Sequence, residues 1–206
     1  SSPESSNTKM ADNVGQYLKS RNWGKLRDIL EDLELQNGGR LVADSAARFA
    51  LSMVVNLLLD DANSARFTWK RIPAKLKADA PELAAVWKVV RADWKSSPLA
   101  FYPATSSFHW NKQLAPFVEA LRESRRIKYE KLIATGYSSI SLENAGVMLG
   151  MAPKEAASYL SAAGWRVDAN GMVHPVQREG RKKDQASLKQ LQQLTTYITH
   201  LEEAAL

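Results

Sequence analysis

The chain has 206 residues, of which 45% are hydrophobic and 8% aromatic, which is ordinary for a globular protein of one or two domains. It contains no cysteine, and this excludes disulfides and zinc sites built from thiolates. A formal net charge of +6 and an isoelectric point of about 9.5 make nucleic acid and acidic protein surfaces the partners to weigh.

The opening residues, 1–9, are rich in serine and carry neither the basic nor the apolar region of a secretory signal. No apolar run approaches the roughly 18 residues that a membrane helix needs. We therefore expect a soluble intracellular protein in which residues 1–9 form a disordered tail.

Residues 10–136 show helical periodicity throughout. The first clear helix has one apolar face, formed by Trp23, Leu26, Ile29, Leu30 and Leu33. Asn22 is its expected N-cap and Asn37-Gly38-Gly39 its stop. Further helices are expected over 41–59, 62–72, 81–94 and 113–134. Phe67 and Phe101 lie 34 positions apart, the length of a tetratricopeptide repeat, so we expect stacked helical hairpins.

Residues 137–176 follow a different pattern. The expected elements are a strand at 138–140, a helix at 142–149 that begins at the cap Ser141 and ends at Gly150, and a helix at 153–162. Alternating runs at 165–167 and 172–174 flank an Asn-Gly pair, which favours a hairpin. This order predicts a winged-helix subdomain with the hairpin as its wing. The alternative is a small helical cap with an incidental turn.

The remaining residues divide into a basic linker, 177–185, and a last helix, 186–206. An apolar seam with alternating spacings of three and four is formed by Leu191, Leu194, Ile198 and Leu201. A helix this short is marginal alone in water, so the seam predicts packing into a bundle with a partner.

No motif for catalysis is present. A metal site is not expected, because His109, His174 and His200 lie far apart in the sequence. Asp60 and Asp61 are interpreted as residues that cap the following helix. The chain has no glycine-rich phosphate loop, nucleophile elbow or His-Glu-x-x-His motif, so we expect no enzyme and no cofactor.

Nucleic-acid binding is the main competing hypothesis, since winged helices often insert their second helix into the major groove. Here that helix carries one cation, Lys154, whereas phosphate binding needs several. The wing offers Asp168 where an arginine would suit the minor groove. Two basic clusters are interpreted as solvated surface or, for the second, pairing between subunits: Arg178, Arg181, Lys182 and Lys183, then Arg122, Arg125, Arg126, Lys128 and Lys131.

The run from Ser64 to Pro73 combines two aromatics, three cations and a helix-ending proline. With it come the segments Trp87 to Trp94, Phe108-His109-Trp110, Tyr137 to Ile140, Gly164 to Asp168 and Leu191 to Glu202. Together they resemble the family of the smallest subunit, subunit eight, of the COP-nine signalosome. That family is related to a proteasome-lid subunit and to a subunit of translation initiation factor three.

The resemblance implies a mainly α fold: helical-hairpin, tetratricopeptide-like repeats, then a winged-helix subdomain, together a PCI domain, and a C-terminal helix. It implies a non-catalytic scaffold that pairs with other PCI subunits through the winged helix and the last helix. The complex removes the ubiquitin-like protein Nedd from cullins with a metalloprotease held by another subunit, which regulates cullin-RING ubiquitin ligases in cytoplasm and nucleus. The two sister complexes remain possible.

Two groups of residues follow for testing. The protein-interaction residues are expected to be Trp165, Val167, Met172, Val173, Val176, Leu191, Leu194, Ile198 and Leu201. The alternating Val173 and Val176 are expected beside an exposed edge strand, and Trp165 is also expected in the core. The scaffold residues of the family motif are expected to be Arg66, Phe67, Trp69, Lys70, Arg71 and Pro73. Neither a membrane nor a specific nucleic acid is an expected partner.

Overall fold

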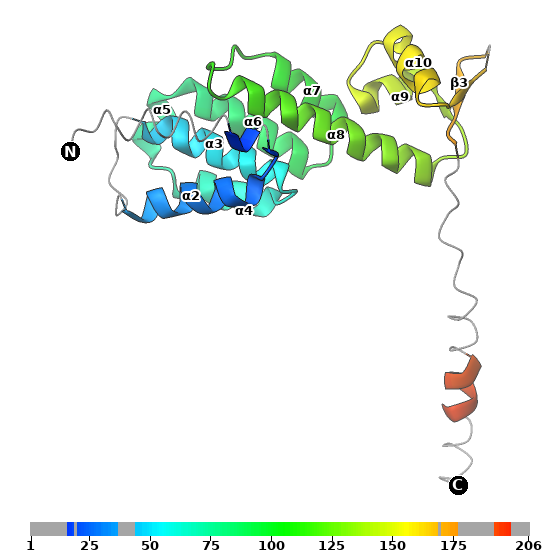
Figure 1. Ribbon diagram of the computed structural model, residues 1–206, viewed down its shortest axis with the longest axis horizontal. Helices are drawn as coiled ribbons and strands as arrows, with labels where there is room; N and C mark the ends of the chain where they lie inside the picture. Colours follow the sequence, from blue (N-terminus) through cyan, green and yellow to red (C-terminus); the bar gives the residue numbers. More distant parts are fainter. Residues whose placement is uncertain (1–15, 19, 37–43, 169, 177–191, 199–206) are drawn as a thin grey trace.

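The computed structural model describes residues 16–18, 20–36, 44–168, 170–176 and 192–198, and these residues are mainly helical (Figure 1). The helices are α2 (Trp23–Gln36), α3 (Ser45–Leu58), α4 (Ala62–Arg71), α5 (Ala74–Asp79), α6 (Pro81–Trp94), α7 (Pro98–Ser106), α8 (Ala115–Gly136), α9 (Leu142–Leu149) and α10 (Pro153–Ala162). The strands are β1 (Ile140–Ser141), β2 (Arg166–Val167) and β3 (Met172–His174). Residues 192–198 are helical as well. In this part of the chain, no helix has the length and apolar character needed to span a bilayer.

The helix ends follow local chemistry. Three predicted N-caps are confirmed, since the side chains of Asn22, Asp61 and Ser141 each accept the backbone N–H three residues later. The backbone turns extended at Ile72, the residue before a proline, as expected. The prediction for Asp60 is wrong, because its φ of 63° lies in the left-handed region and its carboxylate contacts α8 instead of capping α4.

Helix α3 lies at the centre of the helical region, which we define as α2 to α7 with the first half of α8. It packs against α2, α4, α6 and α8. Its side chains of Met53, Val54 and Val55 are buried almost completely. The helix expected over 41–59 is therefore the one that its neighbours surround.

Two helices were not expected, α5 and α7. Helix α5 begins directly after Pro73, and α7 begins with one proline and contains a second, Pro103. Prolines so close together suggest a loop, but Pro73 and Pro98 lie at helix starts, where a missing N–H costs little. Pro103 lies inside α7, where it removes one backbone hydrogen bond of the helix. Phe101 on α7 is buried whereas Phe67 on α4 is 62% exposed, so the 34-residue spacing does not mark equivalent positions.

A small antiparallel sheet closes the chain's second unit, the sheet unit, which comprises β1, α9, α10, β2 and β3. The strand order is β1-β3-β2, with Ile140 and Val167 both paired to Val173. Gly171 provides the positive φ in the hairpin, as the Asn-Gly pair predicts. Leu149 and Leu160 from the two helices are fully buried in the core of this unit.

Helix α8 contributes to both hydrophobic cores. Phe117 and Leu121, in its first half, pack in the core of the helical region. Tyr129 and Ile133, in its second half, pack in the core of the sheet unit. Figure 1 shows α8 running from the helical region to α9 and α10. The two units are therefore joined by one continuous helix.

Arg125 lies on α8 between these two halves and is only 3% exposed. Its Nη2 donates to Asp93 Oδ2 on α6 at 2.8 Å and to the carbonyl oxygen of Leu57 on α3 at 2.8 Å. Its Nη1 lies 3.0 Å from Asp60 Oδ1, and Asp60 also accepts from Lys128 at 2.7 Å. One guanidinium thus joins three helices, so this part of the basic cluster is not the solvated surface that was expected.

The electrostatics of this cluster favour the charged forms. Burial disfavours the charge of Arg125, but its hydrogen bond with Asp93 and the nearby carboxylates outweigh burial and raise its pKa. Burial likewise raises the pKa of Asp60, but hydrogen bonds and charge from Lys128 and Arg125 lower it overall below 3.8. Asp60 therefore stabilises the fold above its ordinary pKa, and this stabilisation is lost as the pH falls through the lowered value.

A close contact between the end of α9 and α7 fixes the sheet unit on the helical region. A Cβ at Gly150 would lie 2.3 Å from the ring of Tyr102 on α7, so only glycine permits this close approach. Burial raises the pKa of Tyr102 to about 12, and its hydroxyl stays neutral. Tyr159 on α10 donates to Glu130 in the second half of α8 at 2.8 Å, which holds the sheet unit on this helix. The joint between the two units is therefore packed and specific.

Substitution of Gly150 by alanine tests this joint. The matched control is Gly164→Ala, because Gly164 also has a positive φ but has no atom within 4 Å of its Cβ position. Left-handed backbone strain of about 1–2 kcal/mol applies at both positions. Overpacking against the Tyr102 ring adds at least about 1 kcal/mol at Gly150 alone. Urea unfolding of the two variants measures the difference, and equal losses of stability would contradict a packed joint.

Replacement of Arg125 by methionine tests the buried ion pair. The substitution keeps an unbranched apolar stem but removes the guanidinium and leaves Asp93 buried without its cation, so we expect the free energy of unfolding to fall by about 3–5 kcal/mol. Lys128→Met makes the same chemical change at a side chain that is 55% exposed and pairs with Asp60. That control is expected to cost less than about 1 kcal/mol in urea unfolding. Similar losses for the two variants would show that burial of Arg125 adds nothing.

Candidate interaction surfaces

The family motif in α4 joins this helix to α6 through aromatic and cationic side chains. The rings of Trp69 and Trp87 are stacked, with centroids 5.0 Å apart and planes 3° from parallel. The guanidinium carbon of Arg66 lies 4.1 Å from the centroid of the Trp94 ring. We call these four residues, with Lys77 at 4.8 Å from the Trp69 centroid, the α4–α6 seam.

Phe67 does not lie on the buried face of α4. Ala65 is completely buried, and Phe67 lies about 200° further round the helix at about 100° per residue. Phe67 therefore points outward with 62% of its surface exposed. The Lys70 ammonium lies 5.4 Å from the centroid of the Phe67 ring and partly covers it.

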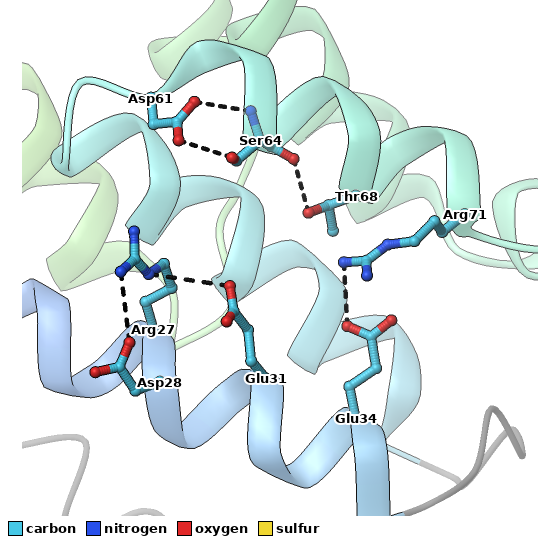
Figure 2. A network of polar contacts seen from close by, with 8 residues as sticks. All are labelled: Arg27, Asp28, Glu31, Glu34, Asp61, Ser64, Thr68 and Arg71. Atoms are coloured by element: carbon cyan, nitrogen blue, oxygen red, sulfur yellow. Dashed lines mark hydrogen bonds and ion pairs between the residues drawn. The ribbon is translucent and has the colours of Figure 1, made fainter.

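The end of α4 is fixed on α2. Figure 2 shows the Arg71 guanidinium reaching Glu34, with Nη2 and Oε2 3.3 Å apart. At the start of α4, both carboxylate oxygens of Asp61 accept from Ser64, through its backbone N–H and its hydroxyl. Pro73 ends α4 and serves as the N-cap residue of α5. The scaffold role expected for this motif therefore agrees with contacts that Arg71 and Trp69 make inside the chain.

Two of the residues expected in the wing are interior. Trp165 is 7% exposed and Val173 is completely buried, and both belong to the core of the sheet unit. Val167 and Met172 are half-buried, whereas Val176 is 51% exposed. The core position expected for Trp165 is confirmed, and only the last of these side chains points largely to solvent.

The expected edge strand is the wrong one. Val173 lies in β3, which is hydrogen-bonded to β1 on one side and to β2 on the other. Within the described sheet, the strands with an open side are β1 and β2. The last strand, β3, lies between the other two. Alternation of apolar and polar residues does not reveal this strand order, because all three strands are short.

The polar groups of the hairpin contact one another. Asp168 Oδ2 lies 2.8 Å from His174 Nε2, and Asp168 Oδ1 lies 3.1 Å from Arg166 Nε. The negative charge of Asp168 thus offsets the positive charge of Arg166 on β2. Nowhere in the described ranges do three or more histidine or carboxylate side chains gather as a metal site would require.

Helical residues 192–198 carry exposed apolar side chains. Leu194 and Ile198, both expected in the seam, are 59% and 54% exposed. Sequence reasoning missed Tyr197, which is 71% exposed and lies three positions after Leu194, so helical spacing alone would place it beside the seam. Leu191, Leu201 and the basic linker 177–185 lie outside the described residues.

Comparisons with known proteins point to one family. A model described as the CSN8/PSMD8/EIF3K family matches residues 49–186, from α3 through the sheet unit. The chain is 34% identical over 185 residues to a protein of Danio rerio named COP9 signalosome complex subunit 8, covering 86% of this chain and 93% of that protein. The protein of the same name from Xenopus laevis is 31% identical over 185 residues, which covers 86% of this chain and 91% of that protein. The one from Arabidopsis thaliana is 29% identical over 191 residues, which covers 92% of this chain and 97% of that protein.

Replacement of Trp165 by alanine distinguishes an interior side chain from a contact surface. A buried tryptophan truncated to alanine is expected to cost about 3–5 kcal/mol of unfolding free energy. Val176→Ala, at an exposed position close to the same sheet, is expected to cost less than about 0.5 kcal/mol. Thermal and urea unfolding measure both variants. An unchanged melting temperature for Trp165→Ala would contradict its burial and return it to the candidate contacts.

Proposed function

The chain belongs to the CSN8/PSMD8/EIF3K family, and we propose that it is a subunit of the COP9 signalosome. The observation that carries this proposal is the likeness to proteins named COP9 signalosome complex subunit 8, which reaches 34% identity and covers 93% of the relative. The likeness takes in the helical region and the sheet unit together, not a single motif. The relatives reported above are all named as signalosome subunits, which favours the signalosome over the two sister complexes whose subunits share the family.

The subunit is proposed to act as a scaffold without its own active site. Supporting this role, the polar residues of the motif and the hairpin are engaged in contacts within the chain, such as Arg71 with Glu34 and Asp168 with His174. These contacts suit the positioning of helices and strands. Removal of Nedd from cullins is then carried out by a metalloprotease subunit of the complex, and this chain supports the assembly in which that occurs.

The sheet unit is interpreted as a winged helix. One strand, two helices and a two-stranded hairpin follow each other, and the sheet order β1-β3-β2 places the final strand in the middle. The open side of β2 presents backbone N–H and C=O groups to which a strand of a neighbouring PCI subunit can add. Arg166 on β2 is exposed and flanks this side.

The C-terminal residues 186–206 are proposed to enter a bundle with the last helices of other subunits. Leu194, Tyr197 and Ile198 expose apolar surface whose burial is worth on the order of 1.5–3 kcal/mol for each fully buried side chain. Helices of this length gain most of their stability from such packing. The chain would thus be part of a hetero-oligomer, in the cytoplasm and nucleus where cullin ligases are regulated.

Purification of the tagged full-length chain from its own cells tests the proposal. The eluate is identified by mass spectrometry and assayed for cleavage of a neddylated cullin. Recovery of several PCI proteins, a metalloprotease subunit and cullin-cleaving activity is the expected result. Proteasome or ribosomal partners would overturn it in favour of a sister complex, and nucleic acid as the main partner would support the competing hypothesis.

Paired substitutions in the last helix test the bundle. Leu194→Asp with Ile198→Asp places two charges in the apolar seam, so we expect the chain to stay folded but to lose incorporation into the complex. Gln192→Asp with Thr196→Asp places the same charges on the opposite side of the helix, because these positions lie about half a turn away. Truncation before Ser187 is expected to act like the first pair. Co-purification of the complex at wild-type yield with the truncated chain would defeat the bundle proposal.

A further inference from the structure

The α4–α6 seam lies in the most basic part of the helical region. Residues 62–95 contain eight lysines and arginines and three carboxylates, so their net charge is +5. The net charge of the whole chain is +6. One of the three carboxylates, Asp93, is 8% exposed and pairs with Arg125. Another, Glu82, accepts the backbone N–H of Asn111 at 3.2 Å. Cations therefore outnumber carboxylates on α4 to α6, although Arg71 among them pairs with Glu34 on α2.

Large aromatic side chains are exposed among these cations. Trp94 is 48% exposed at the end of α6, and Phe67 is 62% exposed on α4. Exposed aromatic side chains that lie beside cations combine apolar contact with charge, the composition found at the centre of many protein interfaces. Neither residue belongs to the hydrophobic core. Trp94 contacts Arg66 but leaves about half of its surface exposed, and Phe67 leaves more than half.

The cations beside these rings are held in defined positions. Arg66 lies over Trp94, Lys70 beside Phe67 and Lys77 over Trp69, at 4.1, 5.4 and 4.8 Å from the ring centroids. A guanidinium stacked on a ring still presents the N–H groups along its edge, and these match a carboxylate in a two-bond geometry. Because the stacked side chain is already ordered, it loses less conformational entropy when a carboxylate binds.

The same contacts disfavour nucleic acid as the occupant. Binding of single strands relies on bases that stack on free aromatic faces. Here Trp69 and Trp87 already stack on each other, and Arg66 covers a face of Trp94. A base could stack on those faces only by displacing these groups. Carboxylates need no free ring face, and apolar side chains can contact the exposed parts of Trp94 and Phe67.

We propose that the α4–α6 seam, together with Phe67 and Lys70, docks an acidic segment of a partner protein, in which carboxylates bind the ring-stacked cations and an apolar side chain contacts Trp94 or Phe67. This surface differs from the edge of β2 and from the last helix. The proposal therefore goes beyond the assembly role and stands or falls independently of it.

Binding of two labelled peptides to the purified full-length chain tests the proposal by fluorescence anisotropy. One peptide is a decamer of alternating pairs of glutamate and single leucines, and the other has glutamine in place of every glutamate. An oligouridine of similar length is the third probe. We expect the acidic peptide to bind more tightly than the other two, and its affinity to fall as salt rises from about 50 to 200 mM.

Charge variants locate the site. Arg66→Gln with Lys70→Gln is expected to weaken binding of the acidic peptide by about tenfold or more, as expected for the loss of two charge-assisted contacts. Lys112→Gln with Lys131→Gln removes the same charge from exposed positions outside the seam and is expected to change the affinity less than about twofold. Arg66→Lys keeps the charge but loses the planar stack, and an intermediate loss is expected.

Four results would overturn the proposal. These are equal affinity for the glutamine peptide, tighter binding of oligouridine, an equal loss in the Lys112 and Lys131 control, and no binding of the acidic peptide at the lower salt concentration. Urea unfolding of each variant checks that the fold is retained. Arg66→Lys, the mildest change, keeps the test decisive if the double variant is destabilised.

Discussion

The orientation of the sheet unit relative to the helical region depends on α8, because this helix supplies side chains to both hydrophobic cores. A helix of 22 residues is about 33 Å long and resists bending, so it transmits position from one core to the other. Arg125 lies at the point where one core gives way to the next and joins α8 to α3 and α6. Movement of its guanidinium would leave the buried carboxylate of Asp93 without a partner, which is costly. The ion pair therefore fixes the rotation of α8 about its own axis.

This arrangement has a consequence for assembly. The α4–α6 seam belongs to the helical region, whereas the open side of β2 belongs to the sheet unit, and α8 with the Tyr102–Gly150 contact keeps the two in a defined relation. A scaffold subunit needs such a relation, since a partner bound at one surface must be held at a fixed distance from a partner at another. Flexible linkage of the two units would leave each surface intact but would lose the geometry.

Local signals in the sequence predicted much of the fold. Caps such as Asn22, Asp61 and Ser141, and the left-handed Gly150, depend on neighbours within a few residues and were found. The resemblance to the family was also confirmed by the match over residues 49–186. The predicted surface was less accurate. Val173 was assigned to an edge, because strand order depends on contacts that strands of two or three residues do not encode.

The buried charge was the largest difference from expectation. Arg125 lies among other cations on a helix whose polar residues are spread over several faces, so the sequence suggests a solvated side chain. Its partner Asp93 lies 32 positions earlier on α6, and no local rule links the two. Phe67 shows the opposite case, since it is an aromatic residue whose angular position on α4 faces outward.

Native-state hydrogen exchange of the amides along α8 in the isolated chain measures the coupling of the two units most directly. If α8 and Arg125 hold the units together, amides from Val118 to Ile133 should exchange only through one common opening, with the same free energy and the same dependence on urea. If the amides after Arg125 opened with the sheet unit at a lower free energy while those before it stayed protected, α8 would not be a rigid link and the account would be contradicted.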